Sequence, residues 1–412
     1  MPRTDSSVST GRAGSLSRRL LAVCGGLVLA LVGLEVLIRV AFPEPPMIDT
    51  GSTFLRDQRP KESYRFRSPH GEYDLTVEIN SLGFHDVEHR LEPDPSTLRI
   101  VVLGDSVPEA IQVPLSQTWW TIAGETLQSA VGRPVEMINL GQGGAGTGKA
   151  LLLLREYGLG FRPDAVILTY VPGNDPFNDS YRLEDKKSKW PFFRLDPQGN
   201  LVQVTRSRWE ASTSRMWWPL WRVSHLYRQV GRRVARAKEA GGRKRMVDGY
   251  HVFYQGFQAQ PPPVWDEAWR VSEALVAEIQ REAHAIDGTM MAVLSPMTFQ
   301  LDDEVWKAIL HTYPAMQDHE WDLQRPMGLA GGLFDRLGIP YLDLLPVLED
   351  SSTRSDRIYF EHDPHWTVVG NLVAGLAVGD FLADQLAIAP DNRRVWLAPA
   401  AESEDRNRGE VQ

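Results

Sequence analysis

Cysteine is nearly absent from this chain. Its 412 residues contain one, Cys24, so neither an intramolecular disulfide nor a cluster of cysteine metal ligands can form. An excess of basic residues is also missing, because 53 acidic and 44 basic residues leave a net charge of -9. A nucleic-acid-binding domain needs a basic face, so we expect no nucleic-acid partner. No set of His, Asp and Glu stands out at metal-ligand spacing, and we expect neither a metal nor another cofactor.

The first 42 residues have the pattern of a membrane anchor. Residues 1–19 are polar and basic, and residues 20–42 are apolar except for Glu35 and Arg39, which can pair across one helical turn. This run can cross ~30 Å of hydrocarbon as a helix. Because arginines precede it, the N-terminus is predicted to be cytoplasmic and everything after Pro43 extracytoplasmic. We therefore expect a single-pass protein of the cytoplasmic (inner) membrane. A cleaved signal peptide is the alternative, although Ala41-Phe42-Pro43 is a poor cleavage site.

The remaining chain has the composition of a globular protein, with 42% hydrophobic and 24% charged residues. Residues 43–97 are predicted to form a linker or small β module, since residues 73–80 alternate between apolar and polar side chains. Residues 98–387 are predicted to form the main domain. Residues 388–412 are predicted to be a tail whose charged end is disordered.

Short apolar strands alternate with amphipathic helices in the main domain. Strands are predicted at 99–104, 135–140, 165–171, 290–295 and 339–344, and helices at 116–131, 147–158, 266–286, 303–312, 322–337 and 367–385. Alternation with nearly continuous apolar strands predicts an α/β fold: a three-layer α/β/α sandwich around a mostly parallel five-stranded sheet. Ligands bind beyond the carboxyl ends of such strands.

Residues 178–262 interrupt this rhythm and are predicted to be an insertion. Tryptophans occur in its middle, and a basic stretch follows in which apolar residues recur at helical spacing over residues 217–238. One interpretation is an amphipathic helix lying in a membrane interface. The other is a cap subdomain with solvated arginines. In either case we expect the insertion to supply the walls of the ligand pocket.

Two short motifs carry the chemistry. The strand that ends at Leu103 runs into Gly104-Asp105-Ser106, and Asp363-Pro364-His365 follows 257 residues after the serine. A serine hydroxyl becomes a nucleophile when an imidazole, oriented by a carboxylate, takes its proton. Another pair with similar residues, Asp86 and His89, precedes the serine and is predicted to lie in an exposed charged turn.

A glycine-rich stretch at residues 141–150 begins after the second predicted strand and opens a helix. It partly matches dinucleotide-binding and phosphate-binding loops. However, Ala150 replaces the hydroxyl residue that would hold magnesium, and Asp164 precedes the next strand where an acidic residue should end it. We favour a simpler use, in which backbone N–H groups of the turn donate hydrogen bonds to an oxyanion.

Four blocks of the sequence together resemble the SGNH (GDSL) hydrolase family. They are Gly104-Asp105-Ser106, Asn139-Leu140-Gly141-Gln142-Gly143-Gly144, Gly173-Asn174-Asp175 and Asp363-Pro364-His365, and they occur in the family's order over residues 99–387. The resemblance implies a flavodoxin-like fold and a Ser106, His365 and Asp363 triad. It also implies an oxyanion hole formed by the N–H groups of Ser106 and Gly144 and the side-chain amide of Asn174, with Gly143 as the neighbouring alternative to Gly144.

The last block departs from the family pattern, which places the aspartate three residues before the histidine. Position 362 is a histidine here, so Asp363 is the nearest carboxylate and Glu361 the alternative. The spacing of Asp363 and His365 is similar to that of anchored polysaccharide O-acetyltransferases related to the family.

The sequence therefore predicts a membrane-anchored, extracytoplasmic serine esterase that cleaves an O-acyl, for example O-acetyl, ester of a small molecule or glycan. One alternative keeps the same residues and transfers the acetyl group to a cell-envelope polysaccharide. An alternative of another class is a catalytically inactive glycan-binding or scaffold module. The sequence identifies no protein partner.

Overall fold

The computed structural model describes residues 11–41, 63–144, 146–184, 192–204, 246–352, 357–388 and 394–396, with residues 224, 226, 227 and 230. The chain divides into two compact units. One comprises residues 1–47 and 206–244, and the other comprises residues 48–205 and 245–412.

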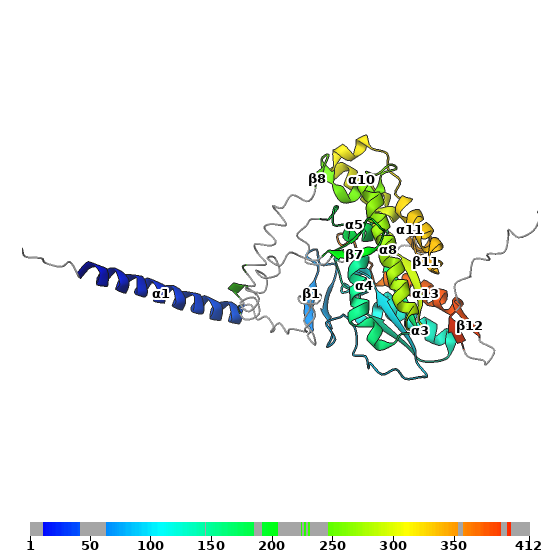
Figure 1. Cartoon of the computed structure of the whole chain (residues 1–412), viewed down its shortest axis with the longest axis horizontal. Coiled ribbons are helices and arrows are strands. Elements are labelled where there is room, and N and C mark those ends of the chain that lie inside the picture. Colours follow the sequence, from blue (N-terminus) through cyan, green and yellow to red (C-terminus); the bar gives the residue numbers. More distant parts are fainter. Residues whose placement is uncertain are drawn as a thin grey trace, which may run out of the picture. The chain divides into compact units, whose positions relative to one another are not determined.

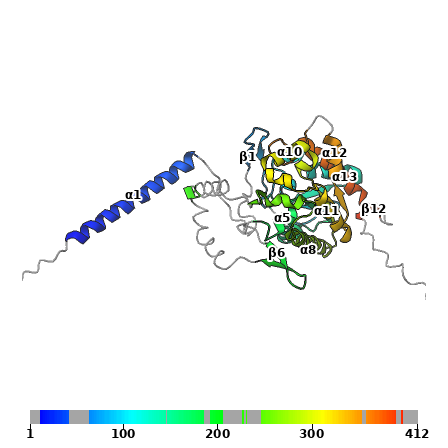
Figure 2. The ribbon, with the colours of Figure 1, turned by 90° about the horizontal axis from the view of Figure 1, so that it is seen from above.

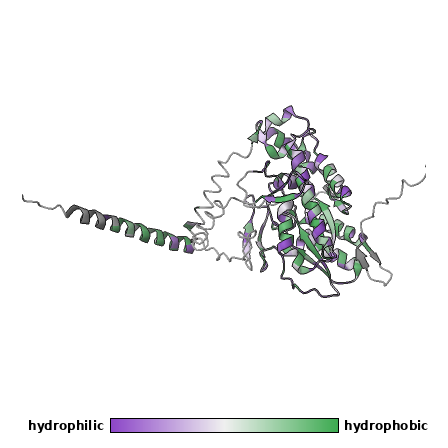
Figure 3. Ribbon diagram, viewed as in Figure 1, coloured by the Kyte–Doolittle hydropathy of each residue, from purple (hydrophilic) through white to green (hydrophobic). Residues whose placement is uncertain are grey.

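Helix α1, Gly11–Ala41, dominates the described part of the first unit (Figure 1). Its residues Leu21–Val40 are long and apolar enough to cross a membrane, as their hydropathy in Figure 3 also shows. A signal sequence has the same properties, so the anchor stays a prediction. The predicted pairing within α1 is confirmed, because Arg39 Nε donates to Glu35 Oε1 at 2.8 Å.

A second contact of Glu35 lies in the same unit. Its Oε2 accepts hydrogen bonds from Ser224 Oγ at 2.8 Å and from the Leu226 backbone N–H at 3.0 Å. The amphipathic helix predicted over residues 217–238 otherwise falls outside the described residues.

The second unit is built on a five-stranded parallel sheet, as predicted. Its strands are β3 (Leu98–Leu103), β4 (Val135–Asn139), β5 (Ala165–Tyr170), β10 (Thr289–Leu294) and β11 (Tyr341–Asp343), in the order β11-β10-β5-β3-β4. The three segments that follow β3, β4 and β5 leave the same edge of the sheet. The serine, glycine and Asn174 blocks therefore converge there.

Helices cover both faces of the sheet, which confirms the three-layer architecture. Alternate residues of β3 point to opposite cores, Val101 and Leu103 to one and Ile100 and Val102 to the other. The first core is covered by α4 (Thr147–Glu156), α8 (Val264–His284) and α11 (Arg325–Arg336). The second is covered by α3 (Trp119–Val131), α12 (Leu345–Ser352) and α13 (Val368–Asp384), and Figure 2 shows α8 and α12 on opposite sides of the unit.

Helix α3 begins three residues later than predicted. Leu115–Gln117 forms the 3-10 turn η1, and the Thr118 side chain then accepts a hydrogen bond from the Thr121 N–H and caps the helix. The other shorter helical elements are α2 (Ser106–Glu109), η2 (Gly158–Phe161), α5 (Asp175–Asp179), η3 (Val252–Phe257), α9 (Thr298–Leu301), α10 (Asp303–Thr312) and η4 (Pro314–Asp318).

Four antiparallel hairpins accompany the sheet: β1–β2 (Tyr64–Arg67, Asp74–Val77), β6–β7 (Phe192–Leu195, Leu201–Val204), β8–β9 (Met246–Val247, Tyr250–His251) and β12–β13 (Leu386–Ile388, Arg394–Trp396). The hairpin β1–β2 and the segment that follows it pack closely within the second unit, because Val77 is fully buried and Phe84 belongs to the first core. Residues 63–97 are the described part of the linker or small module expected at 43–97, and they contribute to this core through Phe84.

Candidate active site

The nucleophile turn follows β3 directly. Gly104 has φ +146°, and a Cβ there would lie 2.8 Å from the Thr169 carbonyl oxygen, so only glycine fits. Asp105 then caps α2 by accepting a hydrogen bond from the Val107 N–H at 3.2 Å. Ser106 is the first residue of α2 and is half-buried. The local sequence therefore fixes the serine at the carboxyl edge of the sheet and leaves it accessible.

The candidate base lies in the loop before α13. His365 Nδ1 is hydrogen-bonded to Asp363 Oδ1, which also accepts the His365 backbone N–H at 3.1 Å. Glu361, the alternative carboxylate, is exposed and forms an ion pair with Arg357 at 2.7 Å. Burial opposes ionisation of Asp363, but hydrogen bonds from His365 and from Tyr73 outweigh it and lower the pKa of this carboxyl. Of the two carboxylates considered, Asp363 is the one that contacts the imidazole.

Gln112 provides a second contact to the same ring nitrogen. Its Nε2 lies 3.0 Å from His365 Nδ1, and its Oε1 is buried without a hydrogen-bond partner among the described residues. When Nδ1 carries the proton that Asp363 accepts, the amide can contact it favourably only through Oε1, so we expect the amide to turn over in that state. Gln112 therefore limits the rotation of the imidazole together with Asp363.

The candidate oxyanion donors come from the other two blocks. Gly144 lies at the site with φ +69°, whereas the N–H of the neighbouring Gly143 already donates to Glu109 Oε2 at 3.0 Å. Asn174 Nδ2 donates to Asp105 Oδ2 at 2.7 Å. Because a side-chain amide carries two N–H bonds, one remains for a ligand. These contacts favour Gly144 over Gly143 as a donor.

Ser106, Gly144, Asn174 and His365 line one cavity of about 300 Å³. The other wall residues are Asp105, Val107, Ala110, Gln112, Val113, Val171, Asn178, Ser295, Pro296, Met297, Tyr359, Pro364, Trp366 and Asn371. Among the residues described, only Asn178 belongs to the insertion, so the expectation that residues 178–262 form the walls is wrong for that part of the chain. The walls come mainly from residues 107–113, from the segment that leaves the sheet after β10, and from the loop between α12 and α13.

No hydrogen bond joins Ser106 Oγ to His365 within the described ranges. Catalytic hydrogen bonds are often long without substrate and tighten when it binds, so both side chains can still act on one substrate in this cavity.

Three buried carboxyl groups, Asp105, Asp175 and Asp179, lie in the segments that carry Ser106 and Asn174. Burial raises the pKa of Asp105, and burial together with the charge of Asp105 raises the pKa of Asp175 well above its usual range. Burial also raises the pKa of Asp179 to about 6, against hydrogen bonds from the Gly148 N–H and the Ser272 hydroxyl. No pattern in the sequence predicts that these three acids are all buried.

Asp175 also has a structural role. Its Oδ2 accepts the Val171 N–H at 2.6 Å and so closes the turn that presents Asn174.

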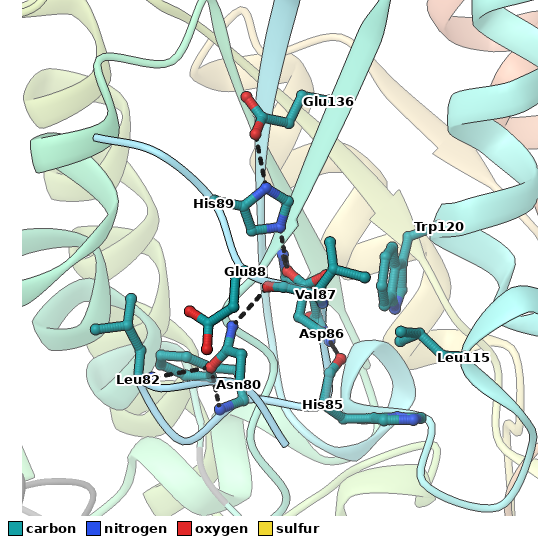
Figure 4. Close-up of polar contacts among 12 residues, drawn as sticks. Asn80, Leu82, His85, Asp86, Val87, Glu88, His89, Leu115, Trp120 and Glu136 are labelled. Atoms are coloured by element: carbon teal, nitrogen blue, oxygen red, sulfur yellow. Dashed lines mark hydrogen bonds and ion pairs between the residues drawn. The ribbon is translucent and has the colours of Figure 1, made fainter. Parts of the chain in front are cut away.

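Asp86 and His89 form a buried cluster, not the exposed turn that was expected (Figure 4). His89 Nε2 lies 2.9 Å from Asp86 Oδ2, and His89 Nδ1 lies 2.7 Å from Glu136 Oε1 on β4. Burial alone would lower the pKa of His89, but these two carboxylates raise it. Asp86 also accepts the Asn139 N–H at 2.7 Å. The expectation failed because β4 is an edge strand, and residues 85–89 supply hydrogen-bond partners to Asn139 and Glu136 along it.

The glycine-rich stretch shows no phosphate-binding arrangement. Lys149 lies within α4 and is buried, with 2% of its surface exposed, so its ammonium group is not presented at the open turn. Among the residues that the structure describes, no group of three or more His, Cys, Asp and Glu is placed to hold a metal ion.

Comparisons with known proteins return likenesses in structure. No protein-family model and no curated protein sequence matches the chain. Among solved structures, the acetyl xylan esterase AlAXEase aligns with 14% identity over 70% of this chain and 98% of its own, with a TM-score of 0.36. TesA aligns with 11% identity over 69% and 98% of the two chains (TM-score 0.36), and a lipase/acylhydrolase from Enterococcus faecalis with 12% identity over 70% and 97% (TM-score 0.36). Identities and TM-scores this low assign no activity.

Proposed function

We propose that this protein is an SGNH-type serine esterase that cleaves an O-acyl ester through Ser106, His365 and Asp363. One observation carries the proposal: Ser106, an imidazole bound to a carboxylate, and the donors Gly144 and Asn174 all meet at a single cavity. These are the groups that acyl transfer requires, and they come from four separate chain segments.

The proposed reaction follows from the position of each group. Ser106 Oγ attacks the acyl carbon while His365 Nε2 takes its proton, and Asp363 holds the proton on Nδ1 and stabilises the imidazolium. The Ser106 and Gly144 N–H groups and the Asn174 amide bind the oxyanion. His365 then returns the proton to the leaving alcohol as the acyl-enzyme forms. Water, activated by the same imidazole, releases the acid and restores Ser106.

The cavity is consistent with a small acyl group. At about 300 Å³ it lies at the lower end of the ~300–1,000 Å³ typical of ligand pockets, and valine, alanine, proline and methionine side chains form its apolar walls. An acetyl group, the smallest of the common acyl groups, fits this space. Transfer of the same group to a glycan hydroxyl would use the same acyl-enzyme with a different acceptor.

We further propose that α1 anchors the protein in the cytoplasmic membrane and that the second unit lies on the extracytoplasmic side. The apolar residues Leu21–Val40 and the preceding arginines support this arrangement. The substrate would then be an acylated molecule of the cell envelope.

Hydrolysis of an acetyl ester by the purified full-length protein in detergent tests the proposal. We expect turnover by the wild type and by Ser129→Ala, which changes an exposed serine on α3, and none by Ser106→Ala. Acetate released only when a polysaccharide acceptor is absent, with acetylated polysaccharide formed when it is present, would identify a transferase. An inactive wild type would favour a binding or scaffold module.

A further inference from the structure

The hairpin β1–β2 contacts the loop that carries the candidate base, although 290 residues separate them. Glu72, in the turn of the hairpin, accepts the backbone N–H groups of Glu361 at 2.6 Å and His362 at 3.0 Å through its Oε1. Burial opposes the negative charge of Glu72, but these two hydrogen bonds, together with His362 and the Ser68 hydroxyl, lower its pKa. The turn therefore fixes the backbone immediately before Asp363.

The next residue of the hairpin reaches the carboxylate itself. Tyr73 Oη donates a hydrogen bond to Asp363 Oδ2 at 2.7 Å, while the other oxygen of Asp363 contacts His365. Burial and then the Asp363 charge raise the pKa of Tyr73, so its hydroxyl remains protonated and can only donate to the carboxylate. With one oxygen held by Tyr73, the carboxylate cannot rotate away from the imidazole.

Aromatic packing holds the tyrosine in this position. Its ring stacks on Phe66 with centroids 5.1 Å apart and meets the edge of Phe360 at 5.2 Å. The rings of His70 and His362 also stack, with centroids 4.2 Å apart and an angle of 8° between their planes. Aromatic side chains of the hairpin therefore pack against those of the loop at two places, Tyr73 against Phe360 and His70 against His362.

We propose that Tyr73 is a positioning residue that acts through Asp363, and that hairpin β1–β2 orders the base of the active site. The inference rests on the proposed function, since it assigns Tyr73 to the same triad. It also assigns a role to residues 63–77, which lie before the region that resembles the SGNH family.

Tyr73→Phe tests this role because it removes the hydroxyl and keeps the aromatic packing. Loss of a hydrogen bond to a charged group predicts a fall in kcat of about 10–100-fold at nearly constant KM. Without the tyrosine donor the pKa of Asp363 rises, so this carboxylate should become protonated, and stop accepting the imidazole N–H, at a higher pH than in the wild type. Thr76→Val removes an exposed hydroxyl from the same hairpin and should change neither quantity.

A proton NMR measurement separates this inference from the proposed function. As the pH falls, protonation of Asp363 should weaken the low-field resonance of the His365 Nδ1–H that is bonded to it. In Tyr73→Phe this weakening should occur at a higher pH than in the wild type, whether or not the protein turns over an ester. If the wild type is inactive but the two proteins differ in this resonance, the proposed esterase activity is refuted and the role of Tyr73 in holding Asp363 is supported. The inference is overturned if Tyr73→Phe matches the wild type in the resonance, or if Thr76→Val alters it equally.

Discussion

The side-chain amide of Asn174 donates a hydrogen bond to the carboxylate of Asp105 at 2.7 Å. This bond connects the turn after β5 to the turn after β3, so the candidate oxyanion donor and the residue before the nucleophile are held as one piece. Asp105 is buried and also caps the helix that begins with Ser106. The position of the serine and the direction of the amide therefore depend on each other.

Removal of this amide should affect the transition state more than substrate binding. We expect Asn174→Ala to lower kcat about 10²–10³-fold, as loss of a single oxyanion donor does elsewhere, with a smaller change in KM. Steady-state kinetics on an acetyl ester measure both. Asn200→Ala, in the exposed turn of hairpin β6–β7, is the control and should retain full activity. Equal kinetics for the two variants would remove Asn174 from the oxyanion hole.

Gln112 should matter for rate without contributing to stability. Gln112→Leu removes the amide beside His365 Nδ1, and loss of one hydrogen bond predicts a kcat about 2–10-fold lower. The free energy of unfolding should change little, because the variant loses one contact but also removes a buried amide that, as oriented in the structure, has one polar atom without a partner among the described residues. Kinetics and urea unfolding of the same preparation test both statements. A large loss of stability with unchanged kcat would contradict them.

Asp179 should make the protein less stable as pH rises. Its native pKa of about 6 exceeds that of an unfolded aspartate, so the native state holds the proton more tightly and loses stability between pH about 4 and about 6. The shift corresponds to about 3 kcal/mol over this window. Asp179→Asn cannot ionise and should flatten the pH dependence of unfolding. The exposed variant Asp318→Asn should leave it unchanged, and an unaltered slope in Asp179→Asn would refute the assignment.

The anchor is tested by the location of the intact chain. We expect the protein to stay with membranes after an alkaline carbonate wash and to be released by detergent, because the apolar side chains of Leu21–Val40 are exposed in α1. Deletion of residues 1–41 should move it to the soluble fraction. A mature N-terminus beginning after Pro43 would show that the segment is a cleaved signal sequence.

The sheet was predictable because buried parallel strands leave a strong sequence pattern. Val101 and its neighbours in β3 are apolar on both faces, and Gly104 after β3, Asn139 at the end of β4 and Ser295 after β10 mark the ligand edge. Contacts between distant segments were not predictable. Nothing in the alternating run at residues 73–80 shows that Tyr73 meets Asp363, and nothing in Asp86 or His89 shows that they would complete the edge of β4. Such contacts depend on how the chain returns to the sheet, which a periodic pattern does not encode.

The identity of the nucleophile is the central claim, and covalent labelling tests it most directly. The full-length protein is treated with a fluorophosphonate, and the modified residue is located by peptide mass spectrometry. We predict one phosphonylated residue, Ser106, with labelling abolished in Ser106→Ala and strongly slowed in His365→Ala. Absence of labelling in the wild type, or a label that persists in Ser106→Ala, would contradict the assignment of this protein as a serine esterase.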